Sequence, residues 1–529
     1  RDAAASIVEH NLYGLDIDDR AAQMAYFVVV MKGCHYDSRF LRRHLNPHVY
    51  AIQESGELTA DALGRLGKQE FTARALLDGF KNAKEYGSIL QPKVTLAELD
   101  ALQEQLREVD GASDMGSLTD QLVAGQIVNV LYPLIEQARM LVQKYDVVVT
   151  NPPYMGSSGM NARLSDYVKK VYPDSKSDLF AVFIERCAQM DKRGGYQAMI
   201  TQHAWMFLSS FEKLRAKLQL IDTVNMAHLG ARGFDEVVQT TSFVMRSSHT
   251  KGYKGTYCRL IDGDSEKAKA EMFVSGENRY VAEQDNFSKI PGSPVAYWVS
   301  TNLYDIFNNM LVKDCAFVGI GMRTGDNDRF LRYWFEVDRN KECFDAENAE
   351  MAIQSKKKWF SYNKGGERRR WYGNNEYIVN WENNGQEIKD NTRLHYPQLG
   401  DNLGWKISNE NQYFKPLLTW TFISSSGFGG VRYKTAGFIC DVQGSMIVAD
   451  NNRLMYLAGI LCSKIATYIL NITNPTMSIQ VKDIANLPAI IESDKEFNVQ
   501  QFVEDNIHKE KSDWDSFETS WDFKRHPLV

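Results

Sequence analysis

Ten residues decide the fold of this chain: Tyr145-Asp146-Val147-Val148-Val149-Thr150-Asn151-Pro152-Pro153-Tyr154. The first six include three consecutive valines and a threonine, a composition that favours a buried strand. The two prolines then end that strand, because each fixes its φ angle and lacks the amide hydrogen that a sheet requires. We therefore predict a strand over 145–150 that leads directly into a rigid loop.

Strands and helices alternate on both sides of this stretch. Upstream, the pattern predicts a strand at 11–17, a helix at 20–32, a strand at 48–53 and a helical insertion at about 57–143. Downstream, it predicts helices at 179–190 and 211–220, and strands at 196–201, 221–227 and 240–245. This alternation is typical of an open, mostly parallel α/β sheet that binds ligands at the carboxyl ends of its strands.

The composition is that of a folded protein with substantial cores. The chain has 529 residues, of which 44% are hydrophobic and 24% charged, with a net charge of −6. This composition excludes a disordered or fibrous chain, and no apolar run reaches the ~18 residues of a membrane span. The seven cysteines are scattered without a CxxC pair, which predicts reduced thiols, a cytoplasmic protein and no metal site. Because the first residue is Arg1, we expect a piece of a longer chain.

The tetrapeptide Asn151-Pro152-Pro153-Tyr154 suits the methylation of an amine on an aromatic ring. Such an amine is a poor nucleophile, because its lone pair is delocalised into the ring. The amide oxygen of Asn151 and the carbonyl oxygen of Pro152 can accept its two hydrogens and so favour a tetrahedral nitrogen that attacks a methyl sulfonium. The prolines fix both directions, and Tyr154 can stack on the base. The competing interpretation is a turn stiffened by proline.

With this motif the chain resembles the adenine-N6 DNA methyltransferases of the gamma arrangement. Three further segments match that family in order: Gly14-Leu15-Asp16-Ile17-Asp18, Ser177-Asp178-Leu179-Phe180 and Gly233-Phe234-Asp235. The resemblance implies that Asp16 binds the ribose hydroxyls of S-adenosylmethionine and that Ile17 packs on the cofactor's adenine. It places Asp178 and Phe180 near the same adenine and Phe234 on the flipped target base. The alternatives are a helix-start acid for Asp16 and a core or loop anchor for Phe234.

One departure concerns the family's first motif, a glycine-rich loop for the methionine end of the cofactor. The residues before Asp16 contain no such loop, and the glycine clusters at 319–321 and 427–430 are typical of turns. We expect the loop upstream of this fragment. The predicted fold is thus an α/β, Rossmann-like class I methyltransferase domain (1–250, truncated at its N-terminus), a connecting region (251–314) and an α+β target-recognition domain (315–529).

Two stretches of the predicted target-recognition domain suggest contacts with duplex DNA. The segment 321–330 resembles the opening of such domains in large fused methyltransferases and contributes Arg323, Thr324 and Asn327. Between 356 and 371, aromatic residues interleave with basic ones. Phosphate contacts are predicted there from Lys356, Lys357, Lys358, Arg368, Arg369 and Arg370. The alternative for this stretch is a solvated basic hairpin.

The run 155–160 and the tail 514–521 resemble the adenine methyltransferases of BREX phage-defence systems. That resemblance covers most of the chain and implies methylation of host DNA alongside other BREX proteins. Three alternatives stay open: a fused restriction–modification enzyme, a methyltransferase for glutamine or RNA amines, and a non-catalytic DNA-sensing subunit.

Overall fold

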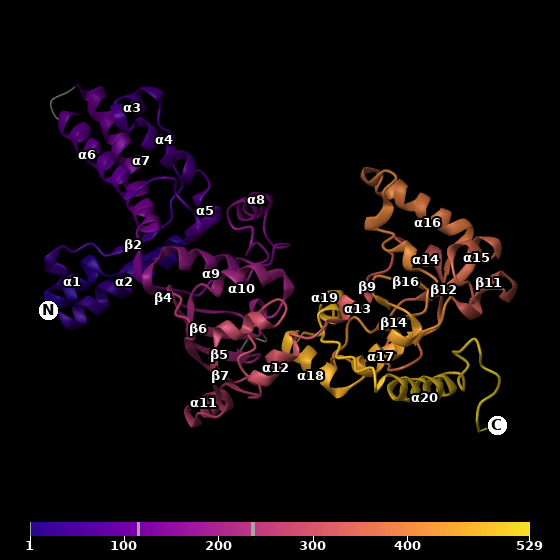
Figure 1. Ribbon diagram of the computed structural model, residues 1–529. Helices are drawn as coiled ribbons and strands as arrows, with labels where there is room; N and C mark the ends of the chain where they lie inside the picture. Colours follow the sequence, from indigo (N-terminus) through magenta and orange to yellow (C-terminus); the bar gives the residue numbers. More distant parts are fainter. Residues whose placement is uncertain (1, 114–116, 234–237, 475, 529) are drawn as a thin grey trace. The chain divides into compact units, whose positions relative to one another are not determined.

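The structure is a computed structural model that describes residues 2–113, 117–233, 238–474 and 476–528 (Figure 1). The chain divides into two compact units, each with its own sheets. Unit 1 comprises residues 1–205 and 210–284, and unit 2 comprises residues 206–209 and 285–529.

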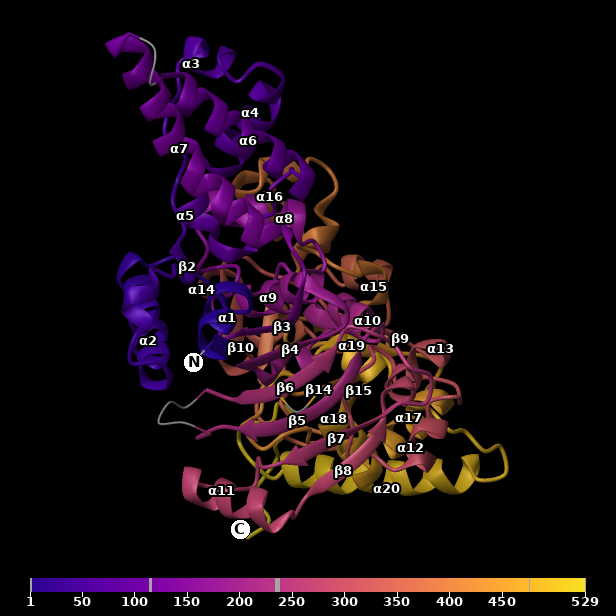
Figure 2. The ribbon, with the colours of Figure 1, turned by 90° about the vertical axis from the view of Figure 1, so that its left-hand side faces the viewer.

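A six-stranded sheet forms the centre of unit 1, in the order β3-β4-β6-β5-β7-β8 (Figure 2). Its strands are β3 (Tyr145–Thr150), β4 (Asp191–Gln202), β5 (Asp222–Gly230), β6 (Thr240–Arg246), β7 (Lys254–Arg259) and β8 (Arg279–Glu283). The pairs β3–β4 and β5–β7 are parallel, whereas β6 is antiparallel to both β4 and β5, and β8 is antiparallel to β7. The predicted α/β class is confirmed. The expectation of a mostly parallel sheet is wrong, because β6 follows β5 too closely for a crossover and returns antiparallel between β5 and β4.

Helices accompany this sheet: α8 (Ala162–Val171), α9 (Leu179–Met190), α10 (Glu212–Leu218) and α11 (Glu266–Ser275). Helix α9 has the bounds predicted from the sequence and packs against β3 and β4. It begins where the Asp178 side chain caps its first turn and buries Phe180, Val182 and Ile184. Strands β7 and β8 extend the sheet beyond residue 250, the predicted end of the first domain.

A second, two-stranded sheet lies near the start of unit 1. It pairs β1 (Tyr13–Asp16) in parallel with β2 (His48–Ala51), and α1 (Asp2–His10) and α2 (Asp19–Tyr36) accompany it. Asp18 caps α2 by accepting the amide hydrogens of Arg20 and Ala21, and these bonds lower the pKa of its carboxyl. The two predicted strands and the helix between them are confirmed.

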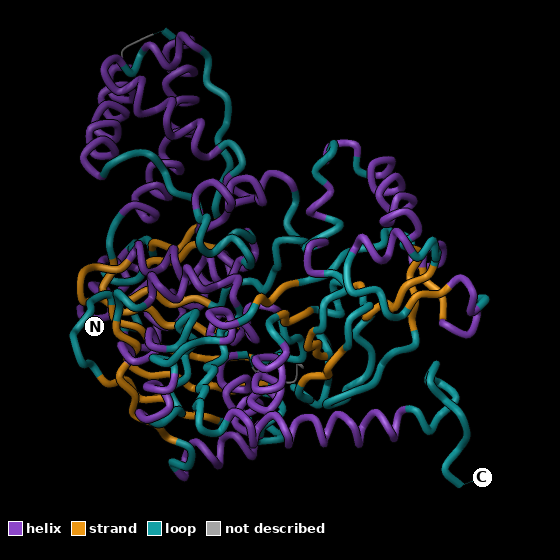
Figure 3. Tube along the Cα trace, turned by 45° about the vertical axis from the view of Figure 1, so that its right-hand side comes forward, coloured by secondary structure: helices purple, strands orange, loops and turns teal. Residues whose placement is uncertain are grey.

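In its described residues, the helical insertion contains helices and no strands (Figures 1 and 3). It consists of α3 (Ala60–Gly64), α4 (Glu70–Phe80), α5 (Ala83–Tyr86), α6 (Leu96–Ser113) and α7 (Leu118–Val142). Leu99 and Leu102 of α6 pack with Leu131 and Ile135 of α7 in a fully buried core. The three- and four-residue spacing of these side chains places them on one face of each helix, as the sequence predicts.

Two smaller sheets organise unit 2. One sheet has the strand order β10-β13-β12-β11, and β16 also pairs with β12. The other sheet has the order β15-β14-β17-β9. The strands are β9 (Phe317–Gly319), β10 (Leu331–Tyr333), β11 (Glu342–Cys343), β12 (Trp359–Asn363), β13 (Tyr377–Asn380), β14 (Leu417–Trp420), β15 (Val431–Lys434), β16 (Ile439–Cys440) and β17 (Met446–Val448). Side chains from both sheets, among them Phe360, Val379, Leu417 and Met446, share one buried core.

Helices complete unit 2. They are α12 (Thr301–Ile306), α13 (Val312–Cys315), α14 (Asn327–Phe330), α15 (Ala349–Gln354), α16 (Glu382–His395), α17 (Asn451–Leu461), α18 (Lys464–Thr473), α19 (Val481–Ala485) and α20 (Glu496–Trp514). Within the described residues, no single helix is long and apolar enough to cross a membrane. The pair α17–α18, bent by 72°, passes that test of length and composition when its two helices are taken together.

Candidate active site

The loop Asn151–Tyr154 begins where β3 ends, at the carboxyl edge of the parallel pair β3–β4. Asn151 and Pro153 are exposed, whereas Pro152 is buried. The buried proline anchors the loop, and its fixed φ angle restricts the direction in which the neighbouring carboxamide points. The Asn151 side chain is thus presented to solvent at the edge where open α/β sheets bind ligands.

Tyr154 fastens the other end of this loop. Its hydroxyl donates to the carbonyl oxygen of Ile200 on β4, at 3.4 Å. Its ring meets the ring of Phe180 edge to face, with centroids 6.2 Å apart, and Phe180 in turn packs on Phe211. Phe180 is fully buried, so in this conformation its ring supports Tyr154 and offers no free face of its own. The predicted contact of Phe180 with the cofactor's adenine stays a prediction.

Asp178 joins the same loop to α9. Its carboxylate accepts the amide hydrogens of Met155 (3.1 Å) and Phe180 (3.3 Å), and the Leu179 amide donates to the Met155 carbonyl oxygen (3.0 Å). Burial raises the pKa of the Asp178 carboxyl, although these backbone hydrogen bonds oppose the rise. Asp178 therefore has a structural role as helix cap and loop clamp, and its predicted role towards the cofactor stays a prediction.

Two histidines, which sequence reasoning missed, lie at the same edge of the sheet. His203 follows β4 and His228 lies on β5, and a hydrogen bond of 2.8 Å joins His203 Nδ1 to His228 Nε2. The register places them near the loop, because Thr150 pairs with Met199 and His228 pairs with Thr241. Burial lowers the pKa of His203 to about 4 and that of His228 to about 3, so both rings are neutral at pH 7.

No spacing in the sequence indicated this histidine pair, because 24 residues separate its members. The one available signal was that His203 comes two residues after the end of a predicted strand (196–201), much as Asn151 follows the strand at 145–150. Phe234, the predicted stacking residue for the target base, lies outside the described residues. Strand β5 ends at Gly230 and β6 begins at Thr240, on either side of that position in the chain.

Asp16 and Ile17 lie at the carboxyl end of β1, as predicted. The Asp16 carboxylate is exposed and accepts one amide hydrogen, from Asp18, at 2.9 Å. Ile17 is 45% exposed, and its Cδ1 atom lies 3.6 Å from the position that a Cβ atom would take at Gly87. An exposed acid beside an exposed aliphatic side chain fits the hydroxyls of a ribose and the face of a purine.

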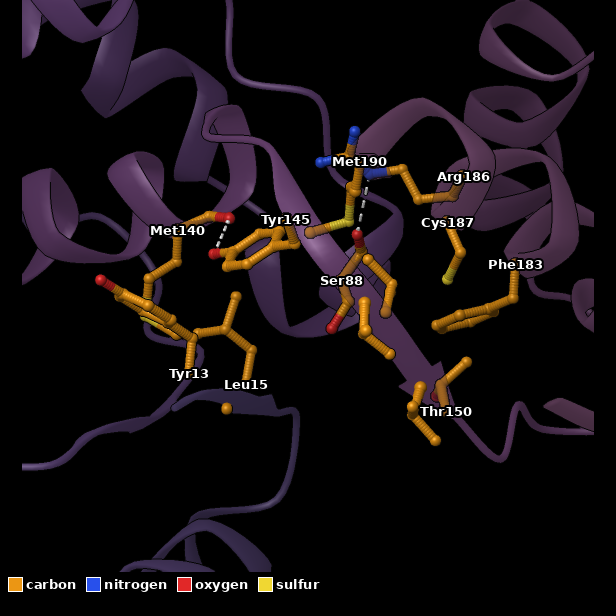
Figure 4. Close-up of a pocket in the computed structure, with 14 residues that line it drawn as sticks. Tyr13, Leu15, Ser88, Met140, Tyr145, Thr150, Phe183, Arg186, Cys187 and Met190 are labelled. Atoms are coloured by element: carbon orange, nitrogen blue, oxygen red, sulfur yellow. Dashed lines mark hydrogen bonds between the residues drawn. The ribbon is translucent and has the colours of Figure 1, made fainter. Parts of the chain in front are cut away.

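The facing edges of β1 and β3 line one cavity (Figure 4). Tyr13 and Leu15 come from β1, Tyr145 and Thr150 from β3, and α9 adds a wall that includes Arg186. Within the described residues, β1 pairs only with β2 and β3 only with β4, so both strands have a free edge on the cavity side. The cavity therefore separates the exposed Asp16 from the loop that begins at Asn151.

The valines of β3 add apolar surface beside this cavity. Val147 is 56% exposed and Val149 is 70% exposed, although both belong to the β-branched run that predicts a buried strand. Exposed apolar residues at alternate positions of an edge strand are typical of surface that another element covers.

In unit 2, the three residues predicted at the opening motif have different surroundings. Thr324 is buried, and its hydroxyl donates to Asn327 Oδ1 at 2.6 Å, which fixes the turn before α14. Arg323 is half-buried: its amide donates to the Lys406 carbonyl oxygen (2.8 Å) and its Nη1 to that of Trp405 (3.2 Å). Asn327 and part of Arg323 therefore reach solvent, whereas Thr324 does not.

Strand β12 divides the predicted basic and aromatic segment along the chain. Lys356–Lys358 precede β12 and Arg368–Arg370 follow it, so the five-residue strand separates the two groups. The aromatic residues Trp359, Phe360 and Tyr362 are buried. The expectation that these three rings interleave with the cations on a surface is wrong, because strand pairing draws them into the core of unit 2.

The lysine group is partly neutralised. The ammonium of Lys357 bonds to the carbonyl oxygen of Asn340, and that of Lys358 lies 3.9 Å from a carboxylate oxygen of Glu382. The arginine group has other partners: Arg369 lies over the ring of Trp514 (4.9 Å), and Arg370 Nε donates to a backbone carbonyl oxygen (3.0 Å). Within the described residues, none of the three arginines forms an ion pair, so their charges are available to a phosphate.

Two fully buried cations, also missed from the sequence, organise the arginine loop. Arg432 donates to the carbonyl oxygen of Gly365 (3.1 Å), and Lys434 donates to those of Gly373 (2.8 Å) and Asn374 (2.9 Å). Burial lowers the pKa of Arg432 to about 10 and that of Lys434 well below its ordinary value. On β15 these two charged residues alternate with uncharged ones, as in any strand with one exposed face. The sequence therefore gave no sign that Arg432 and Lys434 are buried.

The loop at the end of β3 has the features expected of the amino-methylating methyltransferases, and comparisons with known proteins find similar chains of that kind. Residues 10–229 match the Eco57I restriction-modification methylase family.

Over its whole length the chain is 36% identical to the adenine-specific methyltransferase PglX of Lacticaseibacillus casei (strain Zhang) and 36% identical to BrxX of Escherichia coli O9:H4 (strain HS). It spans 44% of the length of each relative. Among solved structures, the Type IIL restriction-modification enzyme MmeI in complex with DNA aligns with a TM-score of 0.48 at 12% identity, covering 76% of this chain and 54% of that one. The resemblance predicted from the sequence is confirmed.

Proposed function

We propose that the protein containing this chain transfers a methyl group from S-adenosylmethionine to the N6 amine of adenine in duplex DNA. The observation that carries the proposal is the exposed carboxamide of Asn151 on a proline-fixed loop at the carboxyl edge of β3. The names of the two relatives, both adenine-specific methyltransferases, support the same reaction.

The proposed chemistry follows from the atoms that the loop presents. Asn151 Oδ1 and the Pro152 carbonyl oxygen accept the two hydrogens of the adenine amine, which localises the nitrogen lone pair for attack. Tyr154, held by Ile200 and Phe180, provides a ring for the base to stack on. Pro152 is buried and its φ angle is fixed, so the backbone that carries both acceptors moves little when the base arrives.

The exposed Asp16 and Ile17 fit the ribose and adenine of S-adenosylmethionine, and the cofactor supplies a sulfonium-bound methyl group when bound. The cavity between β1 and β3 lies between these residues and Asn151. Its two free strand edges support the prediction that a glycine-rich segment from outside these 529 residues completes the cofactor site. The greater length of both relatives is compatible with such a segment.

Unit 2 is proposed to read the DNA, through Arg323, Asn327 and the arginine group Arg368–Arg370. Partners from a BREX phage-defence system belong to the same proposal and rest on the sequence resemblance, whereas a cytoplasmic location rests on the seven scattered cysteines. The available charges of the three arginines support a phosphate-contacting role.

The test uses the full-length protein with methyl-labelled S-adenosylmethionine and three acceptors: duplex DNA, an RNA of the same sequence and a glutamine-containing peptide. We expect label in duplex DNA alone, as N6-methyladenine, with the site identified by single-molecule sequencing of cellular DNA with and without the gene. Label in the RNA or peptide would overturn the proposal. Cleavage of unmethylated DNA with magnesium would instead indicate a fused restriction–modification enzyme.

A further inference from the structure

Trp405 exposes an indole ring on the surface of unit 2. It is 60% exposed, at the end of a short 3₁₀ turn (Leu403–Trp405) that follows α16. Tryptophan is strongly enriched at binding surfaces, because its large ring buries much apolar area with little loss of side-chain freedom. An isolated exposed ring is unremarkable, so its surroundings decide whether it has a role.

A cation holds the ring in place. The Lys406 ammonium lies 3.9 Å from the centroid of the Tyr396 ring and 4.7 Å from that of the Trp405 ring. The two rings meet edge to face, with centroids 6.0 Å apart. Lys406 therefore stands between two aromatic rings, an arrangement that orders the indole and concentrates positive charge beside it.

Arg323 adds a second cation to the same place. Its backbone amide donates to Lys406 and its guanidinium to the carbonyl oxygen of Trp405, so the predicted DNA-contacting motif and the exposed ring form one surface. We name Arg323, Tyr396, Trp405 and Lys406 the Trp405 surface. Within the described part of the chain, neither Arg323 nor Lys406 forms an ion pair, and both charges are available to a ligand.

We propose that the Trp405 surface binds duplex DNA, with the indole placed against bases in a groove and Arg323 and Lys406 beside the flanking phosphates. The proposal rests on the proposed function and adds a contact that the sequence did not indicate. Charge complementarity favours DNA: two unpaired cations flank one apolar ring, which is the combination that contacts phosphate and base together. A protein partner for this surface is the alternative that the test must distinguish.

The test compares Trp405→Ala, Trp405→Phe and Lys406→Gln in the full-length protein, with Phe497→Ala as the matched control. Phe497 lies on α20 of the same unit and is 68% exposed, but it has no part in the Trp405 surface. Binding to a duplex that carries the methylated site is measured by fluorescence anisotropy over a range of salt concentrations. Thermal unfolding of each variant checks that the fold is unchanged.

Trp405→Ala should weaken binding by about tenfold or more, as truncation of a large aromatic anchor at an interface typically does, without changing the salt dependence. Trp405→Phe should recover most of the affinity. Lys406→Gln should lower the slope of log affinity against log salt by about 1, because one phosphate contact is lost. A duplex with 2-aminopurine at successive positions should show fluorescence changes that depend on Trp405 at one or two of them.

Two results would overturn the inference. The first is that Trp405→Ala binds DNA as tightly as the unchanged protein and the Phe497→Ala control do, with methylation in cells unchanged. The second is the same unchanged binding while methylation in cells falls, which would assign the surface to a protein partner. Both presuppose that the unchanged protein methylates adenine in duplex DNA. Failure of that activity itself would instead contradict the proposed function, so the two failures are distinguishable.

Discussion

The sequence predicted functional residues both at the end of strand β3 and in the basic and aromatic segment that contains β12, yet the two regions differ in the structure. In β3, Val147 and Val149 are largely exposed and the loop that follows presents Asn151 to solvent. In β12, all five residues are buried, and the aromatic side chains expected on a binding surface form the core of unit 2. A motif at the end of a predicted strand indicates where its side chains lie in the fold, whereas a cluster of residue types along the chain does not.

The largest effect is expected at the loop after β3. Asn151→Ala should abolish methyl transfer while cofactor and DNA affinity stay nearly unchanged, because its oxygen acts on the target amine. One preorganised acceptor is typically worth 100-fold or more in rate. Single-turnover rates are the measurement, with Asn129→Ala on an exposed face of α7 as the control. A variant that keeps more than about a tenth of the rate would contradict this role.

In unit 2, we expect the largest effect on stability from substitution of a buried cation. Lys434→Met removes donors from the carbonyl oxygens of Gly373 and Asn374 and leaves these buried oxygens unsatisfied. We expect a loss of about 1–3 kcal/mol in the unfolding free energy of unit 2, the usual cost of leaving a buried hydrogen-bond acceptor without its donor. Urea denaturation followed by tryptophan fluorescence measures it, and the exposed Lys509→Met on α20 is the control. A change below 1 kcal/mol would show that the arginine loop keeps its structure without the hydrogen bonds from Lys434.

The buried histidine pair gives unit 1 a dependence on pH. Their folded pKa values, about 4 for His203 and about 3 for His228, lie below the unfolded value of 6.5. The unfolded state then binds more protons, so stability rises with pH between about 4 and 6.5 and is lost as pH falls through that window. From pH 7 to 5 we expect about 2 kcal/mol for each histidine.

Unfolding midpoints of unit 1 at pH 5, 6 and 7 are the measurement for this pair. The double variant His203→Gln/His228→Gln should flatten the dependence, whereas His10→Gln, which changes an exposed ring, should not. An equal slope in the double variant would place the pH response elsewhere.

The smallest effect separates the two basic groups that flank β12. Replacing Arg368, Arg369 and Arg370 by Gln should weaken DNA binding about tenfold at every sequence and flatten its salt dependence. The same change at Lys356–Lys358 should have less than a twofold effect, since Lys357 and Lys358 already have protein partners. Salt titrations of DNA binding by both triple variants are the measurement. Equal effects would show that the two basic groups bind DNA as one patch.

The sequence was sufficient where local chemistry determines structure. Strand 145–150 and helix 179–190 appear with the predicted bounds, because prolines end the strand and Asp178 caps the helix. Strand order was not predictable, since the place of β6 between β4 and β5 depends on long-range pairing. Within the site, Asn151–Tyr154 and Asp16 lie at the predicted strand ends, whereas the His203–His228 contact depends on β4 and β5, which the folded sheet brings to either side of β6.

The free edges of β1 and β3 also determine how this chain behaves at high concentration. Unpaired backbone amides beside the exposed Val147 and Val149 are a template for another strand, and a second copy of the chain can supply one. Purified without a segment that covers this surface, the chain should self-associate through its sheet edges and precipitate as concentration rises. Charged substitutions such as Val149→Lys should keep it in solution.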